Sequence, residues 1–269
     1  MDPDLDPIAK QNRQYWTAEV TARYRYTRPW LDLDPEQIHR FARGNIDTLP
    51  EPYIYIYPRH IFEQIAGKTV LCLGSGGGQQ SAIFGLLGAR VTALDLTDAQ
   101  LENDRKAARH YGYDITTVQG DMRDLSAFPN ETFDLVYQAI SICFVSDVRP
   151  VYREVARVLK PGGIYRVGHL HAATVLVDED SWTGAGYVLP GPVRGGRIED
   201  DAYDAVVFCH LYSDIFNGLT EAGLRIQTVW EDPRHLKDNL NSKPGTYDHL
   251  LSYTQSYFAV VAKKELILH

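Results

Sequence analysis

The sequence predicts an α/β fold in which a mostly parallel sheet of seven strands has helices on both faces. Two observations lead to this prediction. Short apolar runs alternate with helical segments between residues 70 and 170, and the first run passes directly into a glycine-rich turn. Strands that alternate with helices pair in parallel through right-handed crossovers. Ligands bind such sheets at the carboxyl ends of the strands, so the residues at those ends form the candidate site.

The first strand and its turn read VLCLGSGGGQQ, over residues 70–80. The apolar run fits a buried strand. Glycines at 74, 76, 77 and 78 leave no Cβ atoms to obstruct a ligand above the end of that strand. A helix is expected to start near Gln79, with its first backbone N–H groups facing the same ligand.

The second strand ends in Asp95, about 20 residues after the first glycine, where an acid can hold the two hydroxyls of a ribose. A dinucleotide fingerprint needs a third glycine where Gln79 stands, and a Walker loop needs a Lys that is absent here. The pattern favours a nucleoside-containing cofactor other than NAD. If the glycines are considered without Asp95, the alternative is that they form only a tight turn and bind no ligand.

The later elements follow in the order that this fold requires. TDAQ at residues 97–100 is a capping box, which predicts a helix from just after Asp95 to Tyr111, where Gly112 ends it. Strands are expected at 115–118, 133–140 and 163–170, and a helix from about 147 to the KPGG turn at 160–163. A helix at 212–224 and strands at 224–231 and 256–264 complete the sheet.

Five motifs in this order, VLCLGSGGG, ALDLT, GDM, FDLVYQAI and VLKPGG, resemble those of class I S-adenosylmethionine-dependent methyltransferases. The resemblance covers residues 68–170. Within the family, the chain is similar to the small-molecule type that includes quinone-biosynthesis enzymes. It implies a Rossmann-like core with the last strand antiparallel, S-adenosylmethionine as cofactor and S-adenosylhomocysteine as product. The implied reaction is in-line methyl transfer to O, N, S or C of a small molecule. A protein or nucleic-acid methyltransferase and a non-catalytic nucleotide-binding member of the fold are the alternatives.

Position by position, the resemblance implies that Asp95 accepts both ribose hydroxyls and that Asp121 accepts the adenine amino group. Further implied contacts are Gly74, Ser75, Gly76 and Gly78 at the methionine part, Leu96 and Met122 at the adenine, and Gln138 near the amino-acid end or the methyl group. Cys72 stands where the family usually has an acid that contacts the methionyl amine. Since a thiol accepts weakly, Gln79, Gln80 or an N-terminal residue is expected to take that contact.

Four segments are expected along the chain. Residues 1–66 form an N-terminal helical cap or lid, 67–170 the cofactor-binding core, 171–211 a substrate lid insertion, and 212–269 the C-terminal helix and antiparallel strand pair. In the cap, Tyr15, Trp16 and Tyr24 are expected to cover the cofactor and exclude water; the alternative is the packing face of a surface helix. The Gly- and Pro-rich insertion suits a moving lid, and a plain surface hairpin is equally consistent.

Histidines are the candidate general bases. Methyl transfer mainly needs placement, and a base helps when the nucleophile is a hydroxyl or a protonated amine. His169 ends the fifth strand and His210 precedes the last core helix, with His171 a weaker candidate; a structural role is the alternative for each. HLH at residues 169–171 has no third partner, so no metal site is expected.

The charge and composition of the chain limit which kinds of partner it can bind. The net charge of −8 argues against a nucleic-acid partner. The N-terminal segment has four basic residues interleaved with aromatic ones, as in an amphipathic lid. They are Arg13, Arg23, Arg25 and Arg28.

No apolar run is long enough to span a membrane, and the start MDPDLDP is unlike a signal peptide. Three cysteines without CxxC spacing suit a reducing, cytoplasmic setting as buried filler, with a soft-metal site as the alternative. A monomer or homodimer is expected.

Overall fold

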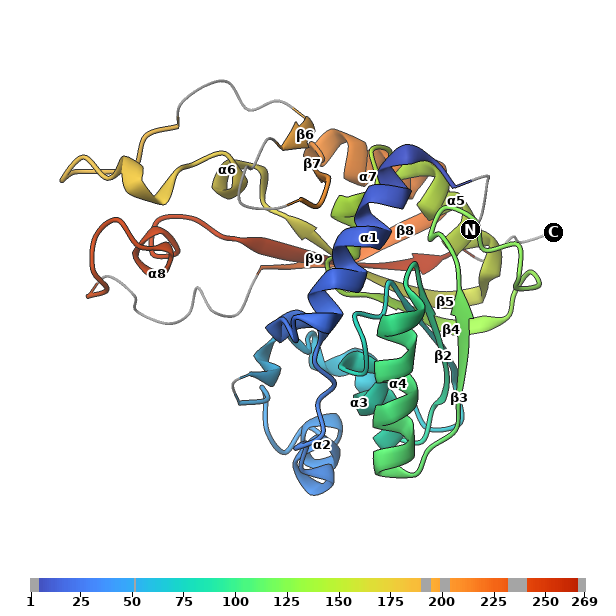
Figure 1. Cartoon of the computed structure of the whole chain (residues 1–269). Helices are drawn as coiled ribbons and strands as arrows, with labels where there is room; N and C mark the ends of the chain where they lie inside the picture. The colour runs from blue at the N-terminus through green and yellow to red at the C-terminus, as the bar shows by residue number, and fades with distance from the viewer. Residues whose placement is uncertain (1–4, 51, 190–194, 199–203, 232–240, 266–269) are drawn as a thin grey trace.

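A seven-stranded sheet of order β3-β2-β1-β4-β5-β9-β8 lies at the centre of the computed structural model (Figure 1). The structure describes residues 5–50, 52–189, 195–198, 204–231 and 241–265. Neighbouring strands from β3 to β5 pair in parallel, and β9 pairs antiparallel with both β5 and β8. The predicted fold class is therefore confirmed, including the antiparallel last strand.

The strands lie close to where the apolar runs predicted them. They are β1 (Thr69–Leu73), β2 (Arg90–Asp95), β3 (Ile115–Gln119), β4 (Phe133–Gln138), β5 (Leu159–Leu170), β8 (Leu224–Glu231) and β9 (Tyr257–Lys264). β1 is buried almost throughout, as is typical of a parallel strand covered on both faces.

Helices cover both faces of the sheet. They are α3 (Gln80–Leu86) and α4 (Asp98–Tyr111) on one face, with α5 (Arg149–Val158) and α7 (Tyr212–Glu221) on the other (Figure 1). Each face has its own apolar core. Val155 and Ile215 belong to one cluster, and Phe84 and Ala107 to the other.

Two strands differ from their predicted limits. β4 ends at Gln138 because a 3-10 turn, η4 (Ser141–Phe144), follows it. β5 begins at Leu159 and contains the predicted KPGG turn. Its register against β4 shifts between Phe133 and Leu135, and this bulge accommodates the turn.

The start of α4 fixes the end of β2. Thr97 caps the helix by accepting a hydrogen bond from the Gln100 backbone N–H, and Gly112 ends it at φ +72°. The reciprocal half of the predicted capping box is not formed, because the Thr97 N–H donates to Asp95 Oδ1 at 2.9 Å instead. The carboxylate of Asp95 is thereby tied to the helix that follows it.

The N-terminal segment packs over the α3 face and the carboxyl ends of the strands. It contains α1 (Pro7–Thr21), η1 (Arg25–Thr27), α2 (Pro35–Ala42), η2 (Tyr53–Tyr55) and η3 (Arg59–Phe62). α1 crosses in front of the sheet (Figure 1), and Phe62 stacks on Phe84 of α3 at 5.0 Å between ring centroids. The predicted cap therefore has a helix placed over the candidate site.

The insertion after β5 contains α6 (Ala172–Val175), η5 (Glu179–Ser181) and an antiparallel pair, β6 (Gly196–Ile198) with β7 (Val207–Cys209). Its α6–η5 part and α8 (Tyr247–Leu250) extend beyond the end of the sheet (Figure 1), whereas β7 contacts η4. Parts of the predicted lid, residues 190–194 and 199–203, lie outside the described residues. Among the helices of the described ranges, none is long and apolar enough to cross a bilayer.

Candidate active site

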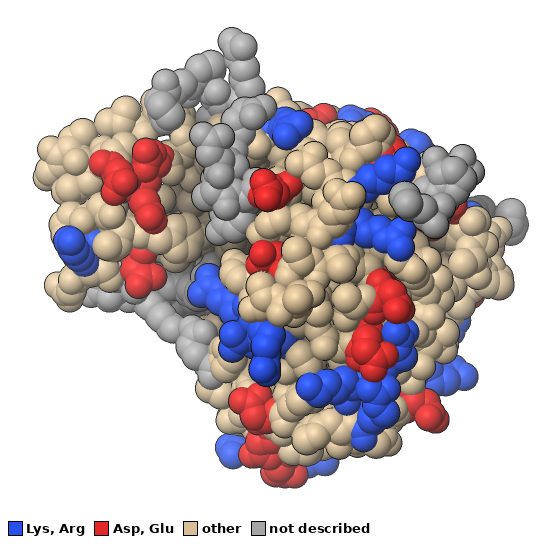
Figure 2. Space-filling view, viewed as in Figure 1, with Lys and Arg blue, Asp and Glu red and all other residues tan. Residues whose placement is uncertain are grey.

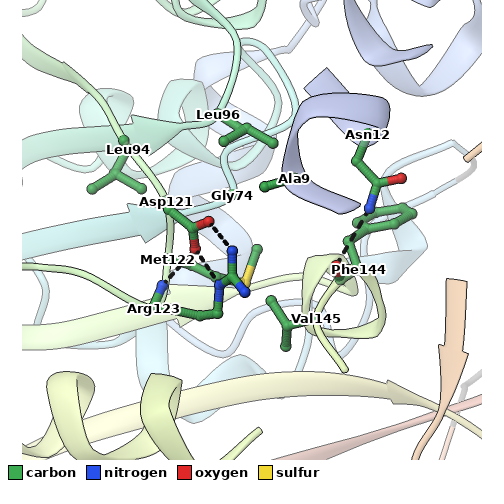
Figure 3. A pocket seen from close by; sticks show the side chains of 11 residues that line it. Ala9, Asn12, Gly74, Leu94, Leu96, Asp121, Met122, Arg123, Phe144 and Val145 are labelled. Atoms are coloured by element: carbon green, nitrogen blue, oxygen red, sulfur yellow. Dashed lines mark hydrogen bonds and ion pairs between the residues drawn. The ribbon is translucent and has the colours of Figure 1, made fainter. Parts of the chain in front are cut away.

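A cavity of about 40 Å³ lies at the carboxyl ends of β1, β2 and β3, beneath α1 (Figure 3). Its lining residues come from five parts of the chain: Ala9, Asn12, Gly74, Leu94, Leu96, Gly120, Asp121, Met122, Arg123, Phe144 and Val145. The fold thus brings together four of the predicted cofactor contacts.

The glycine loop above β1 has a backbone that other residues rarely adopt. Gly76 has φ +70° and Gly78 has φ +80°. A Cβ on Gly78 would lie 2.6 Å from the Asn103 carbonyl oxygen of α4, whereas a Cβ on Gly76 would have Tyr26 O at 3.8 Å as its nearest neighbour. Gly78 therefore allows close packing of the loop on α4, and Gly76 borders open space.

Gly78→Ala is expected to destabilise the fold more than Gly76→Ala. Both changes place a side chain at positive φ, which costs about 1–3 kcal/mol, but only Gly78→Ala also pushes against the backbone of α4. Urea unfolding of both variants measures the difference in the free energy of unfolding. Equal losses would show that packing on α4 does not explain Gly78.

Asp95 lies at the end of β2 beside the loop and is only 8% exposed. Its Oδ1 accepts from the Thr97 N–H and hydroxyl, and its Oδ2 accepts from the Gly76 N–H at 3.3 Å. Burial raises the pKa of Asp95 above its usual value, while these hydrogen bonds act in the opposite direction. The carboxylate is held in one orientation, and its neighbours Leu94 and Leu96 line the cavity.

Asp121 lines the cavity with its carboxylate already engaged (Figure 3). Oδ1 accepts from Nε and the backbone N–H of Arg123, both at 2.9 Å, and Oδ2 accepts from Arg123 Nη2 at 2.5 Å. The same Nη2 forms an ion pair with Asp6, the N-cap of α1. The predicted adenine acid is thus linked through Arg123 to the helix that covers the cavity, a link that the sequence did not reveal.

Gln138 is fully buried beside the cavity. Its Nε2 donates to Met122 Sδ at 3.2 Å and to Ser141 Oγ at 3.1 Å, and its Oε1 accepts from the Tyr165 hydroxyl. Because both ends of the amide are engaged, the arrangement supports a role in holding Met122 in the cavity wall. A direct cofactor contact by Gln138 stays a prediction.

Two glutamines were expected to replace the acid missing at Cys72. Gln79 Nε2 donates to the backbone carbonyls of Tyr26 and Arg28, which ties the loop to the cap. Gln80 Nε2 is buried and has no hydrogen-bond partner within the described ranges. Cys72 lies in the apolar core, where burial raises the pKa of its thiol well above the usual value. Gln80 Nε2 is therefore a free donor, which does not supply the acceptor that a methionyl amine needs, and that role for Gln80 stays a prediction. Cys72 behaves as apolar filler.

Asp104 of α4 is a functional candidate that the sequence analysis missed. It is fully buried and binds the glycine loop: Ser75 Oγ donates to Oδ2 at 2.5 Å, and the Gly78 N–H donates to Oδ1 at 2.8 Å. Ser75 therefore faces this carboxylate. The signal was present, because an acid three residues after Leu101 and three before Ala107 falls on the buried stripe of the helix.

The cap aromatics lie near the cavity without lining it. Trp16 packs edge-on against Phe144 at 5.3 Å, Tyr15 packs against Trp16, and Tyr24 packs against Tyr26. The α1 residues that line the cavity are Ala9 and Asn12. The proposed cover over the cofactor therefore depends on residues whose small or polar side chains gave no signal in the sequence.

Asn12 fastens α1 to two other segments. It is 1% exposed, and its Nδ2 donates to Phe144 O at 3.3 Å and Val206 O at 3.1 Å (Figure 3). Its Oδ1 accepts from the Val206 N–H at 2.7 Å. The lid helix, the turn after β4 and the insertion before β7 are therefore joined at one buried amide.

The histidine candidates lie in different surroundings. His169 stacks on Phe258 in the core, its Nε2 lies 3.3 Å from the Tyr152 hydroxyl, and burial lowers its pKa well below the usual value. His210 Nε2 lies 2.8 Å from the carbonyl oxygen of Val145, a cavity residue, and burial lowers its pKa. His171 packs edge-on against Tyr212. His210 is the candidate linked to the cavity wall.

No metal centre is formed in the part of the chain that the structure describes. No group of three or more His, Cys, Asp or Glu side chains is placed to hold an ion there. The cysteines at 72, 143 and 209 are free and buried. Their placement matches the expectation of buried apolar filler.

Comparisons with known proteins bear on the family to which the chain belongs. The model of the methyltransferase domain family matches residues 71–167. An uncharacterized methyltransferase, YbaJ, of Bacillus subtilis is 31% identical over 85% of this chain and 92% of its own length. A ubiquinone biosynthesis O-methyltransferase of Proteus mirabilis is 28% identical over 74% of this chain and 76% of its own length.

The fold has a close counterpart among solved structures. A crystal structure of an S-adenosylmethionine-dependent methyltransferase from Mesorhizobium loti superposes with a TM-score of 0.61 at 23% identity, over 87% of this chain and 99% of that one. Together with the 31% identical relative that spans most of both chains, these findings identify the family. The chain belongs to the class I S-adenosylmethionine-dependent methyltransferases, and it is an enzyme that takes S-adenosylmethionine as its cofactor.

Proposed function

We propose that this enzyme methylates a small-molecule acceptor at O, N, S or C, and that the cavity beneath α1 is part of its cofactor site. The observation that carries the proposal is the convergence of Gly74, Leu96, Asp121 and Met122 on one cavity that α1 encloses. These residues match the family motifs at the loop and at the adenine. A covered site suits a small acceptor better than a macromolecule, which needs an open face.

The residues present fit the cofactor. The unpartnered Nε2 of Gln80 suits the methionyl carboxylate, and Asp95 keeps lone pairs for ribose hydroxyls. When bound, S-adenosylmethionine supplies a methyl group that its sulfonium already activates. The protein's own contribution is to bind, to orient and, through α1, to exclude water from the reacting groups.

The acceptor class rests on two further observations. One relative is named a ubiquinone biosynthesis O-methyltransferase, an enzyme of a small molecule. On the face shown in Figure 2, acidic groups and uncharged surface interrupt the basic groups, and the whole chain has a net charge of −8. A nucleic-acid acceptor would favour a continuous basic surface. A monomer or homodimer and a cytoplasmic location, which free cysteines suit, complete the proposal.

For an acceptor that must lose a proton, we propose His210 as the general base. His210→Phe is expected to lower kcat about 10²-fold, the usual contribution of a positioned base, while the Kd of S-adenosylhomocysteine changes little. His169→Phe is the comparison, because its ring stacks in the core and its loss should mainly affect stability. Equal kcat in His210→Phe and wild type would remove the base assignment.

The first experiment is calorimetric titration of the protein with S-adenosylhomocysteine, S-adenosylmethionine and NAD. Micromolar binding of the two sulfur nucleosides without NAD binding is expected. Candidate phenols, amines, thiols and activated carbon acids are then screened with methyl-labelled cofactor, beside a protein extract and total RNA. Label transferred to protein or RNA, and to none of the small acceptors, would contradict the small-molecule proposal.

A further inference from the structure

The glycine loop is held from two sides by two buried carboxylates. Asp95 of β2 accepts from the Gly76 N–H at 3.3 Å. Asp104 of α4 accepts from Ser75 Oγ, from the Gly78 N–H and from Ser81 Oγ, at 2.5, 2.8 and 2.5 Å. Every side-chain hydrogen bond that the structure gives Asp104 goes to residues 75–81, and none goes to its own helix.

An acid in this position is costly to bury. Asp104 is fully buried, and no basic side chain in the described ranges forms an ion pair with it. The ionisable groups that face it are Cys72 of β1, Asp95 of β2 and Tyr113 after α4, and none of them supplies positive charge. Burial raises the pKa of Asp104 to about 6, while the hydrogen bonds from Ser75, Ser81 and the Gly78 N–H act in the opposite direction. In all three bonds the carboxylate is the acceptor.

An apolar residue in this place would leave the Ser75 and Ser81 hydroxyls and the Gly78 N–H without an acceptor in the core. The carboxylate is therefore bonded to the loop and does more than fill space. The loop at Gly74 to Gly78 has positive φ at each glycine, and its shape must be imposed from outside. Asp104 orders the loop at both ends, at Ser75 and at the first turn of α3.

We propose that Asp104 is a positioning residue for the cofactor: it fixes the glycine loop in its binding shape without touching the cofactor itself. Cys72, directly below the loop in β1, supplies no strong acceptor, and Asp104 supplies one from the neighbouring helix. The inference rests on the proposed cofactor site.

The test compares three variants by titration with S-adenosylhomocysteine. Asp104→Leu removes all acceptors and is expected to raise the Kd about 10- to 100-fold. Its melting temperature is also expected to fall, because three buried donors lose their acceptor. In Asp104→Asn the side-chain oxygen can still accept from the Gly78 N–H, and the side-chain NH2 group can donate to a serine hydroxyl oxygen. This variant should therefore bind much more tightly than Asp104→Leu. Asp98→Asn, an exposed acid of the same helix, is the control and should bind like wild type.

With an acceptor in hand, Asp104→Leu should raise the KM for S-adenosylmethionine and leave the KM for the acceptor unchanged. A folded Asp104→Leu protein with wild-type Kd would overturn the proposal. If that variant does not fold, Ser75→Ala/Ser81→Ala keeps the charge and removes two donors to it. The double variant should bind more weakly, and unchanged affinity would likewise overturn the proposal. Absence of binding by the wild type would instead contradict the cofactor site.

Discussion

Asp95→Ala is expected to weaken binding of S-adenosylhomocysteine by about 1–3 kcal/mol, or about 5- to 150-fold in Kd. The buried carboxylate is held beside Gly76 by Thr97 and can accept hydroxyl hydrogens with its remaining lone pairs. In the proposed cofactor site, its removal would leave the ribose hydroxyls without this acceptor. Titration calorimetry measures the change.

Asp95→Asn separates this role from a structural one. The asparagine oxygen can still accept from the Thr97 N–H, but the second acceptor becomes a donor. We expect weakened binding in a folded protein whose melting temperature falls somewhat, because the new amide group faces the Gly76 N–H. Asp98→Ala, an exposed acid at the start of α4, is the matched control. Wild-type affinity in a folded Asp95→Asn protein would remove Asp95 from the ribose role.

Removal of α1 is the change with the next largest expected effect. Deletion of residues 1–22 takes away Ala9 and Asn12 from the cavity wall and leaves Trp30, whose N–H donates to Gly78 O. Turnover should fall about 10²-fold, because substrate placement and water exclusion are both impaired. Circular dichroism should report a folded core. Full turnover of the shortened protein would contradict the lid.

A single substitution tests how the lid is held. Helix α1 contributes Ala9 and Asn12 to the cavity wall, so the bonds that fasten it should affect how fast a bound cofactor leaves. Asn12→Ala removes the link to Phe144 and Val206 and should speed dissociation of S-adenosylhomocysteine in a stopped-flow chase. Gln11→Ala, which loses one exposed hydrogen bond to Asp204 O, is the control. Equal dissociation rates in both variants would exclude Asn12 as the fastening residue.

Much of the fold was predictable because its signals are local. The run of residues 70–80 predicted β1, the glycine turn and the start of α3. Gly112 predicted the end of α4, because glycine readily adopts the left-handed conformation that ends a helix. Apolar runs also located β8 and β9 at the end of the chain. In each case the residues that specify the element are neighbours in sequence, and the pairing order follows from handedness and the crossovers.

The site was predictable in part for the same reason. Leu96, Asp121 and Met122 follow strands of a parallel sheet, and such residues meet at one edge. The state of their side chains was not predictable. Asp121 is engaged by Arg123, and Gln138 is engaged by Met122 and Tyr165. Those contacts depend on side-chain direction, which a local pattern does not specify.

By itself the sequence determined the class of sheet with its strands and helices in chain order, the glycine loop, the place of Asp95 and the family to which the chain belongs. The tertiary structure decided which residues hold that loop and cover it. Asp104 reaches Gly78 across 26 positions of the chain, and Asn12 reaches Val206 across 194. Hydrogen bonds over such separations form only when packing brings whole elements together, so no window of the sequence contains both partners.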